Sequence, residues 1–218
     1  MSAAATPIRA FLFDIGNVLL RFDFAHALRA LAAHCDEEEP TAVLARLEDV
    51  KLAYEDGQID RASFLRAAFQ ALRYRGLEPD FIRAWEEIFE PNEPMIALVE
   101  QLHGRFPLYL LSNTSDIHRD YVFRQYPFFA RFSGGVYSYL ARRSKPGREI
   151  FEHAARELGL TPETTFFIDD LQANIATAQA LGYICHHYHH ERHDALLADL
   201  RAHGVAVSGS SDPSVADQ

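Results

Sequence analysis

The chain has 218 residues, of which 48% are hydrophobic and 24% charged, so one α/β domain with an insertion and a packed core is expected. Its formal net charge of -10 argues against a general nucleic-acid-binding surface but not against a local cationic pocket for a small anion. Two distant cysteines, Cys35 and Cys185, and the lack of a signal-peptide pattern predict a cytoplasmic protein without disulfides. No apolar run reaches the ~18 residues of a membrane span.

The first predicted strand, residues 8–13, is a run of mainly large apolar residues that ends at Asp14. Gly16 and Asn17 follow as turn residues, which is typical of a buried strand in a parallel sheet. Open α/β sheets bind their ligands at the carboxyl ends of such strands. Taken alone, however, Asp14 fits a simple turn residue equally well.

Four helical segments without strand character come next, near residues 25–33, 41–54, 60–76 and 79–89. Asp60 is expected to cap the third of them. Prolines at positions 91 and 94 interrupt the chain after the fourth. The pattern predicts an inserted helical cap over residues 22–92, with hinges near residues 21–24 and 90–94.

Helices and strands then alternate. The predicted strands cover residues 108–111, 135–139, 164–168 and 183–187, and the helices cover residues 95–102, 116–126, 146–158, 173–181 and 191–202. Strands separated by helices of ~10 to 15 residues predict βαβ units and a parallel sheet. The predicted fold is a doubly wound α/β core of residues 1–21 and 93–207, followed by a mobile tail over residues 208–218.

Polar residues follow three of these strands, and a lysine precedes a helix start; they are Asp14, Ser112, Asn113, Asp169, Asp170 and Lys145. They can converge because the carboxyl ends of parallel strands share one edge of the sheet. Three adjacent carboxylates are unfavourable without a cation, and Mg²⁺ prefers carboxylate and phosphate oxygens. Together with a lysine and a Ser-Asn pair, these groups are the parts that phosphoryl transfer needs.

The order of these motifs resembles the haloacid dehalogenase-like superfamily, in the branch with a helical cap after the first motif. The resemblance covers roughly residues 8–205. It depends on four ordered motifs, which are Phe-Asp-Ile-Gly-Asn-Val at 13–18, Leu-Leu-Ser-Asn-Thr at 110–114, Ser-Lys-Pro at 144–146 and Phe-Ile-Asp-Asp-Leu-Gln-Ala-Asn at 167–174. Each motif is weak alone, and the ordered set is specific.

The resemblance implies a role for each matching residue. Asp14 is the implied nucleophile that forms an aspartyl-phosphate, Ser112 and Asn113 bind the phosphoryl group, and Lys145 neutralises it and orients Asp14. The implied Mg²⁺ ligands are Asp14, Asp170, the Gly16 carbonyl, and Asp169 either directly or through water. Asn174 would steady the acidic loop or reach Lys145.

Gly16 departs from the family pattern, because most phosphatases of this family carry a second aspartate there as general acid and base. Three explanations stay open. Asp23 or a cap residue supplies the proton, the substrate has a good leaving group, or the protein is a catalytically weak phosphosugar-binding or regulatory protein. The Asp-X-Gly-Asn form resembles a minority branch of sugar-1-phosphate phosphatases that act on glucose 1-phosphate.

The sequence therefore predicts Mg²⁺-dependent hydrolysis of a small phosphorylated metabolite, without nucleic acid or membrane partners. A 2-haloacid dehalogenase is the chemical rival, but the founding dehalogenases work without metal and do not need the acidic pair Asp169 and Asp170. A few residues between Glu55 and Ile59 are expected to face the site and select the substrate. Monomer and homodimer both fit the sequence.

Overall fold

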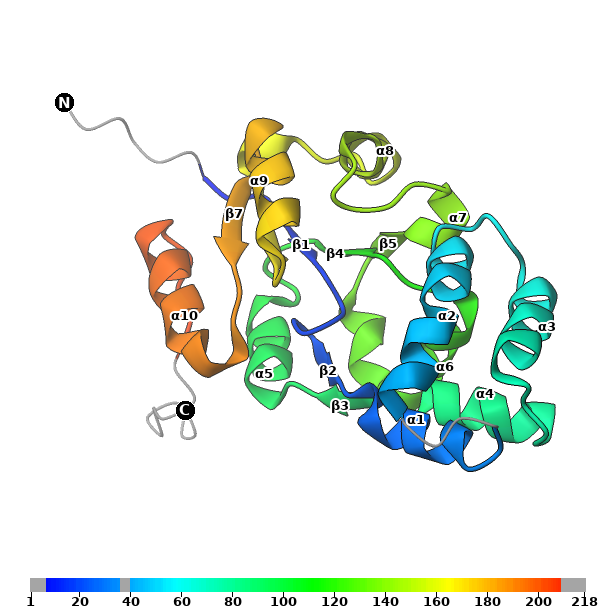
Figure 1. The fold of residues 1–218 in the computed structure, drawn as a ribbon. Helices are drawn as coiled ribbons and strands as arrows, with labels where there is room; N and C mark the ends of the chain where they lie inside the picture. The colour runs from blue at the N-terminus through cyan, green and yellow to red at the C-terminus, as the bar shows by residue number, and fades with distance from the viewer. Residues whose placement is uncertain (1–6, 36–39, 209–218) are drawn as a thin grey trace.

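The computed structural model describes residues 7–35 and 40–208 of the chain (Figure 1). Most of the predicted mobile tail, residues 209–218, lies outside the described residues. Ser208, the first residue of that prediction, is placed, and its backbone amide donates to Gln101 Oε1 over 2.8 Å. Within the described ranges, no helix is long and apolar enough to cross a membrane.

Five parallel strands form the central sheet, in the order β5-β4-β1-β6-β7. The strands are β1 Ala10–Phe13, β4 Leu108–Ser112, β5 Gly134–Tyr137, β6 Thr165–Asp169 and β7 Ile184–His187. The central strand β1 is buried on both faces and pairs with β4 and β6 on either side. This pairing puts the carboxyl ends of β1, β4 and β6 side by side, which is the arrangement that brings their polar residues together.

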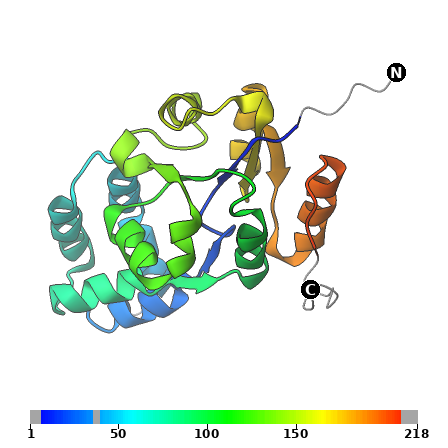
Figure 2. The same ribbon diagram turned by 180° about the vertical axis from the view of Figure 1, so that it is seen from behind.

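Helices cover both faces of the sheet (Figure 1 and Figure 2). Alternate residues of β1 face opposite layers, so Phe11 and Phe13 pack with α5 Glu93–Leu102 and α10 His193–Ala202. Leu12 packs on the other face with α8 Arg148–Glu157 and α9 Gln172–Ala180. The predicted doubly wound α/β fold is therefore confirmed.

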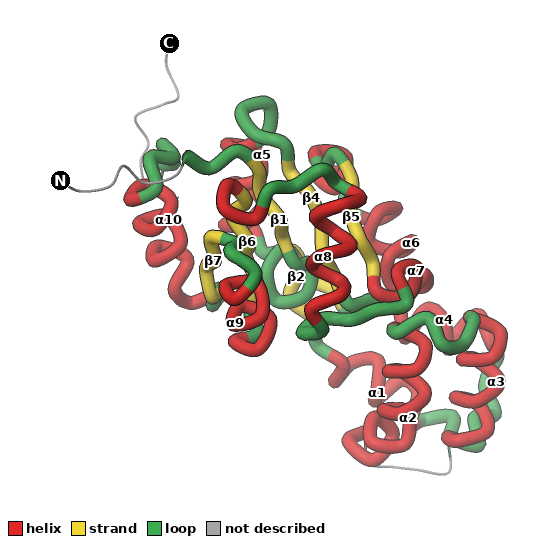
Figure 3. Tube along the Cα trace, turned by 90° about the horizontal axis from the view of Figure 1, so that it is seen from above, coloured by secondary structure: helices red, strands yellow, loops and turns green. Residues whose placement is uncertain are grey.

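Four helices between β1 and β4 share a separate hydrophobic core and lie as a group beside the sheet (Figure 3). They are α1 Phe24–Ala32, α2 Pro40–Glu55, α3 Arg61–Leu72 and α4 Glu78–Glu86. As predicted, Asp60 caps α3, and its side chain accepts from the Ser63 amide over 2.8 Å. The division of the chain into core and cap at residues 22 and 92 stays a proposal, which this separate core supports.

A small antiparallel ribbon joins the helical group to the sheet. It pairs β2 Leu20–Phe22 with β3 Phe89–Pro91, two segments that overlap the predicted hinges near residues 21–24 and 90–94. The prediction that the fourth helix extends to Phe89 was therefore wrong, because Phe89 pairs with Phe22 instead. The segment Phe89–Pro91 is short, has no alternating pattern and ends in proline, so its own sequence gives little indication of a strand. The pairing could therefore not be predicted from that segment alone.

The remaining elements connect the sheet strands, except for the last 3₁₀ turn, which joins β7 to α10. They are α6 Asp116–Gln125, α7 Ser138–Ala141 and three 3₁₀ turns at Pro127–Arg131, Pro162–Thr164 and His190–Arg192. The predicted strand over residues 135–139 was wrong at its end, because Ser138 begins α7. The helix predicted from Pro146 begins at Arg148.

Candidate active site

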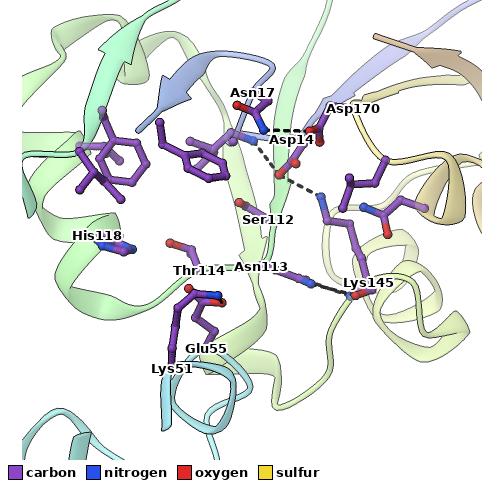
Figure 4. A pocket seen from close by; sticks show the side chains of 18 of the residues that line it. Asp14, Asn17, Lys51, Glu55, Ser112, Asn113, Thr114, His118, Lys145 and Asp170 are labelled. Carbon is purple, nitrogen blue, oxygen red and sulfur yellow. Dashed lines mark hydrogen bonds and ion pairs between the residues drawn. The ribbon is translucent and has the colours of Figure 1, made fainter. Parts of the chain in front are cut away.

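A pocket of about 270 Å³ opens at the carboxyl ends of β1, β4 and β6, between the sheet and the four-helix group (Figure 4). Seven of the eight predicted site residues line it, namely Asp14, Gly16, Ser112, Asn113, Lys145, Asp170 and Asn174. The eighth, Asp169, is fully buried behind Lys145. The four motifs are thus brought together in space as the strand order requires.

Lys145 joins two carboxylates in the interior. Its Nζ lies 2.9 Å from Asp14 Oδ1 and 2.7 Å from Asp169 Oδ2, and its side chain is 1% exposed. Burial opposes the charge of this lysine, but Asp14 and Asp169 more than offset that effect and raise its pKa. Lys145 is therefore a fixed positive charge beside Asp14.

Asp169 is held on both carboxylate oxygens. Oδ2 bonds Lys145, while Oδ1 accepts from the Leu171 amide over 2.9 Å and from Asn174 Nδ2 over 2.8 Å. The sequence left two roles open for Asn174: it could steady the acidic loop, or it could reach Lys145. Its amide contacts Asp169, so it steadies the acidic loop.

Asn113 fixes the loop that carries Lys145. Its side-chain Nδ2 donates to the Lys145 carbonyl over 2.8 Å, and its Oδ1 accepts from the Lys145 amide over 2.9 Å. This paired contact engages the side chain of Asn113, a residue that the resemblance implied as a phosphoryl-binding residue. Ser112, at the end of β4, is 3% exposed and lies between Asp14 and Thr114 in Figure 4.

The turn after β1 brings Gly16 to the pocket. The Ile15 carbonyl accepts from the Leu19 and Leu20 amides, and the Asn17 amide donates to the Leu20 carbonyl over 2.7 Å. Among the described residues, none of these turn bonds falls on the carbonyl of Gly16, which lines the pocket. These turn bonds therefore do not engage the Gly16 carbonyl, which the resemblance implied as a metal ligand.

Asn17 has a role that the sequence analysis missed. It adopts a left-handed conformation with φ 53°, which asparagine tolerates better than most residues. Its Nδ2 donates to Asp170 Oδ2 over 3.0 Å and so ties the first motif to the fourth. The Gly-Asn pair directly after the strand was the available signal for this conformation.

The three carboxylates form a site that suits a cation bound by oxygen. Ligand atoms of Asp14, Asp169 and Asp170 lie within 4.8 Å of one another. Burial raises the pKa of Asp14 to about 7, an effect that Lys145 opposes and that Asp169 and Asp170 reinforce. One ammonium against three carboxylates leaves uncompensated negative charge, and a divalent ion would offset it.

The far side of the pocket belongs to the four-helix group and to α6. Lys51 and Glu55 of α2 line it together with His118 of α6. Asp23, one of the residues considered as a proton source, does not line the pocket; its exposed carboxylate caps α1 by accepting from the Ala25 amide over 2.7 Å. Among the described residues of the predicted cap, Glu55 is the carboxylate that lines the pocket.

His118 is expected to make folding stability depend on pH below about 6.5. It is 4% exposed and bonds the Trp85 carbonyl over 2.9 Å. Burial lowers its pKa to about 4, and Lys51 contributes. Between this value and ~6.5 the unfolded chain binds more protons, so the free energy of unfolding rises with pH across this range and is lost as the pH falls, by roughly 3 kcal/mol in total.

Thermal unfolding of the wild type and of His118→Gln between about pH 4 and 7 checks this expectation. Glutamine keeps a donor for the Trp85 carbonyl but does not titrate. The free energy of unfolding should therefore change less with pH in the variant, because its unfolding takes up about one proton fewer. Equal pH dependence in both proteins would contradict the neutral, buried histidine.

Comparison with known proteins agrees with this geometry. A family model of haloacid dehalogenase-like hydrolases matches residues 8–182. The chain is 25% identical over 196 residues to D-ribitol-5-phosphate phosphatase of Bacteroides thetaiotaomicron, a match that covers 81% of this chain and 89% of the relative.

Solved structures show the same relationship. A HAD family enzyme of Bacteroides thetaiotaomicron, in complex with magnesium and inorganic phosphate, is 26% identical with a TM-score of 0.71 over 82% of this chain and 93% of that one. L-2-haloacid dehalogenase from Xanthobacter autotrophicus shares the fold, with a TM-score of 0.60 and 17% identity over 82% and 76% of the two chains. Because the family model spans most of the chain, the protein belongs to the haloacid dehalogenase-like hydrolases.

Proposed function

We propose that the protein is a Mg²⁺-dependent phosphatase that hydrolyses a small phosphorylated sugar or polyol. The observation that carries this proposal is the Lys145 ammonium bonded to Asp14 in the lining of a pocket that Asp170 also lines. A carboxylate fixed beside a buried cation is suited to attack a phosphoryl group. A phosphatase relative and a neighbour bound to magnesium and phosphate support it.

The donor set fits Mg²⁺, which is usually held by one or two carboxylates and waters. We assign the ion to Asp14, Asp170 and the Gly16 carbonyl. Asp169 has both oxygens engaged by Lys145, Leu171 and Asn174, so it acts through water or through Lys145. When bound, Mg²⁺ offsets the charge of the phosphoryl oxygens.

The proposed reaction has two displacements at phosphorus. Asp14 attacks, the bond between phosphorus and the leaving-group oxygen breaks, and that oxygen takes a proton from water. The resulting hydroxide attacks the aspartyl-phosphate, which releases inorganic phosphate and restores the Asp14 carboxylate. Lys145, the Ser112 hydroxyl and the Asn113 backbone amide bind the phosphoryl oxygens during both steps.

Phosphate release tests this proposal with glucose 1-phosphate, ribitol 5-phosphate, other sugar phosphates and nucleotides, with Mg²⁺ and with chelator. Turnover that chelator removes is expected, with sugar or polyol phosphates preferred. If no substrate turns over above Asp14→Asn while Mg²⁺ and a phosphosugar still bind, the binding-protein alternative is correct. Halide release from a 2-haloacid in the presence of chelator would favour the dehalogenase alternative.

Gly16→Asp is expected to raise turnover most clearly when Phe22 is also made smaller. A Cβ at Gly16 would lie 3.1 Å from Cε1 of Phe22, so the exposed ring has to shift by a few tenths of an ångström to admit the new side chain. In the double variant with Phe22→Ala, the carboxylate can reach the leaving group and supply general acid catalysis. Turnover of polyol phosphates should then rise at least about tenfold over Phe22→Ala alone. No gain would show that the proton is already supplied.

A further inference from the structure

The pocket has a second polar end that the proposed phosphoryl chemistry does not use. Lys51 and Glu55 lie one turn apart on α2, with side chains 16% and 17% exposed and with Nζ 3.6 Å from Oε2. Both line the cavity that contains Asp14. Figure 4 shows them across the cavity from Asp14, with Ser112 and Thr114 in between. This end therefore faces the part of a substrate that leaves.

The surrounding wall offers few alternatives for polar recognition. Its other contributions on this side are mainly apolar, from Phe22, Phe24, Ile88, Phe89 and Val122. His118 also lines the pocket, but its Nε2 is engaged by the Trp85 carbonyl. A leaving group with hydroxyls would thus find its charged and polar partners chiefly at Lys51 and Glu55.

The position of Glu55 is fixed by the turn that ends α2. The hydroxyl of Ser138 donates to the Glu55 carbonyl over 2.5 Å and accepts from the Thr114 amide over 2.9 Å. One buried hydroxyl therefore connects the loop after β4 to the turn that carries Glu55. This contact sets the separation between the phosphate end and the second polar end.

Two further side-chain hydrogen bonds hold the same turn against the core. Tyr54 donates to Asp116 Oδ1, and Ser144, the residue before Lys145, donates to Asp56 Oδ1. Gly57 packs so closely on Tyr139 that an added Cβ would lie 2.2 Å from the Tyr139 carbonyl oxygen. The turn over residues 54–57 is thus attached to three separate segments of the core.

We infer that Glu55, paired with Lys51, determines specificity by accepting hydrogen bonds from hydroxyl groups of an uncharged, polyhydroxylated leaving group. This inference rests on the proposed phosphatase function and names its substrate class. An apolar leaving group would bury the Glu55–Lys51 pair without hydroxyl partners, and an acidic one would be repelled by the carboxylate. Sites built to bond a hydroxyl discriminate strongly against substrates that lack it.

The test compares ribitol 5-phosphate with p-nitrophenyl phosphate, whose leaving group has no additional hydroxyl. The selectivity ratio is kcat/KM for the first divided by kcat/KM for the second. Glu55→Leu should lower it at least about tenfold, mainly through KM, and Glu55→Gln should lower it less because an acceptor oxygen remains. Glu48→Gln is the matched control, because Glu48 also pairs with Lys51, at 3.7 Å, but does not line the pocket.

The outcomes separate the inference from the function on which it rests. A ratio in Glu55→Leu within about twofold of the wild type overturns the inference alone, because phosphatase activity is then present without this selectivity. A wild type that hydrolyses neither substrate overturns the proposed phosphatase function, and the inference with it. A ratio that falls equally in Glu48→Gln also overturns the inference, because the effect then comes from charge near Lys51 and not from Glu55.

Gly57→Ala provides a second test that leaves Glu55 itself unchanged. Its clash with Tyr139 should displace the turn and lower the selectivity ratio in the same direction as Glu55→Leu. Gly159→Ala is the matched control, because Gly159 has a similar φ of +63° against +67° at Gly57 but no atom within 4 Å of an added Cβ. An unchanged ratio in Gly57→Ala would overturn the claim that the turn positions Glu55.

Discussion

Asp14→Asn is expected to lower phosphate release by at least about 10⁴-fold, which corresponds to roughly 5 kcal/mol or more of barrier. The amide is nearly isosteric with the carboxylate, and its oxygen can still accept from the Ile15 amide, a bond of 2.8 Å in the wild type. It has no negative charge with which to attack phosphorus. Phosphate release from the preferred substrate, at saturating Mg²⁺, measures the loss.

The stability of the same variant separates loss of chemistry from loss of fold. Burial, reinforced by Asp169 and Asp170, raises the pKa of Asp14 despite Lys145, so the charged carboxylate is unfavourable without metal. The melting temperature of Asp14→Asn in chelator should therefore not fall below that of the wild type. Mg²⁺ should raise the melting temperature of the wild type more than that of the variant, because one ligand is lost.

Asp60→Asn is the control for this substitution. Asp60 caps α3 from an exposed position, and asparagine caps helices about as well. Its activity and melting temperature should match the wild type. If Asp14→Asn kept more than about a hundredth of the activity, the nucleophile would have to lie elsewhere in the pocket.

The sheet was predictable because its strands carry strong local signals. The runs at β1 and β6 are apolar on both faces, which is typical of buried parallel strands. Each run ends in acidic residues. The ribbon of β2 and β3 was not predictable, because its stability comes from pairing between segments that are distant in sequence. Tertiary pairing of this kind leaves no periodic pattern in either segment.

The convergence of the motif residues was predictable for the same topological reason, since parallel strand ends share one edge. The partners of those residues were not. The motif implied that Asn113 binds the phosphoryl group, but it gave no sign that both ends of the side-chain amide bond the Lys145 backbone. Ser138 carries no motif at all, and its position between Thr114 and Glu55 depends on how the helical group docks on the core.

Lys145→Met should lose both activity and stability. The lysine side chain is 1% exposed, and its removal leaves Asp14 and Asp169 buried without their shared cation. Breaking a buried ion pair on one side typically costs about 3 to 5 kcal/mol. Urea unfolding in chelator should show that loss, and phosphate release should fall by about 10² to 10³-fold because a fixed charge near the phosphoryl group is gone.

The double variant Lys145→Met with Asp169→Asn should separate the two effects. Asp169 is fully buried, so neutralising it removes one of the carboxylates that the single variant leaves unpaired. Much of the lost stability should return, and the coupling of two contacting residues should exceed about 0.5 kcal/mol in the double-mutant cycle. Activity should stay low, because no cation replaces the ammonium beside Asp14. Recovery of activity together with stability would show that Lys145 serves only the fold, and the proposed role in binding the phosphoryl group would then be wrong.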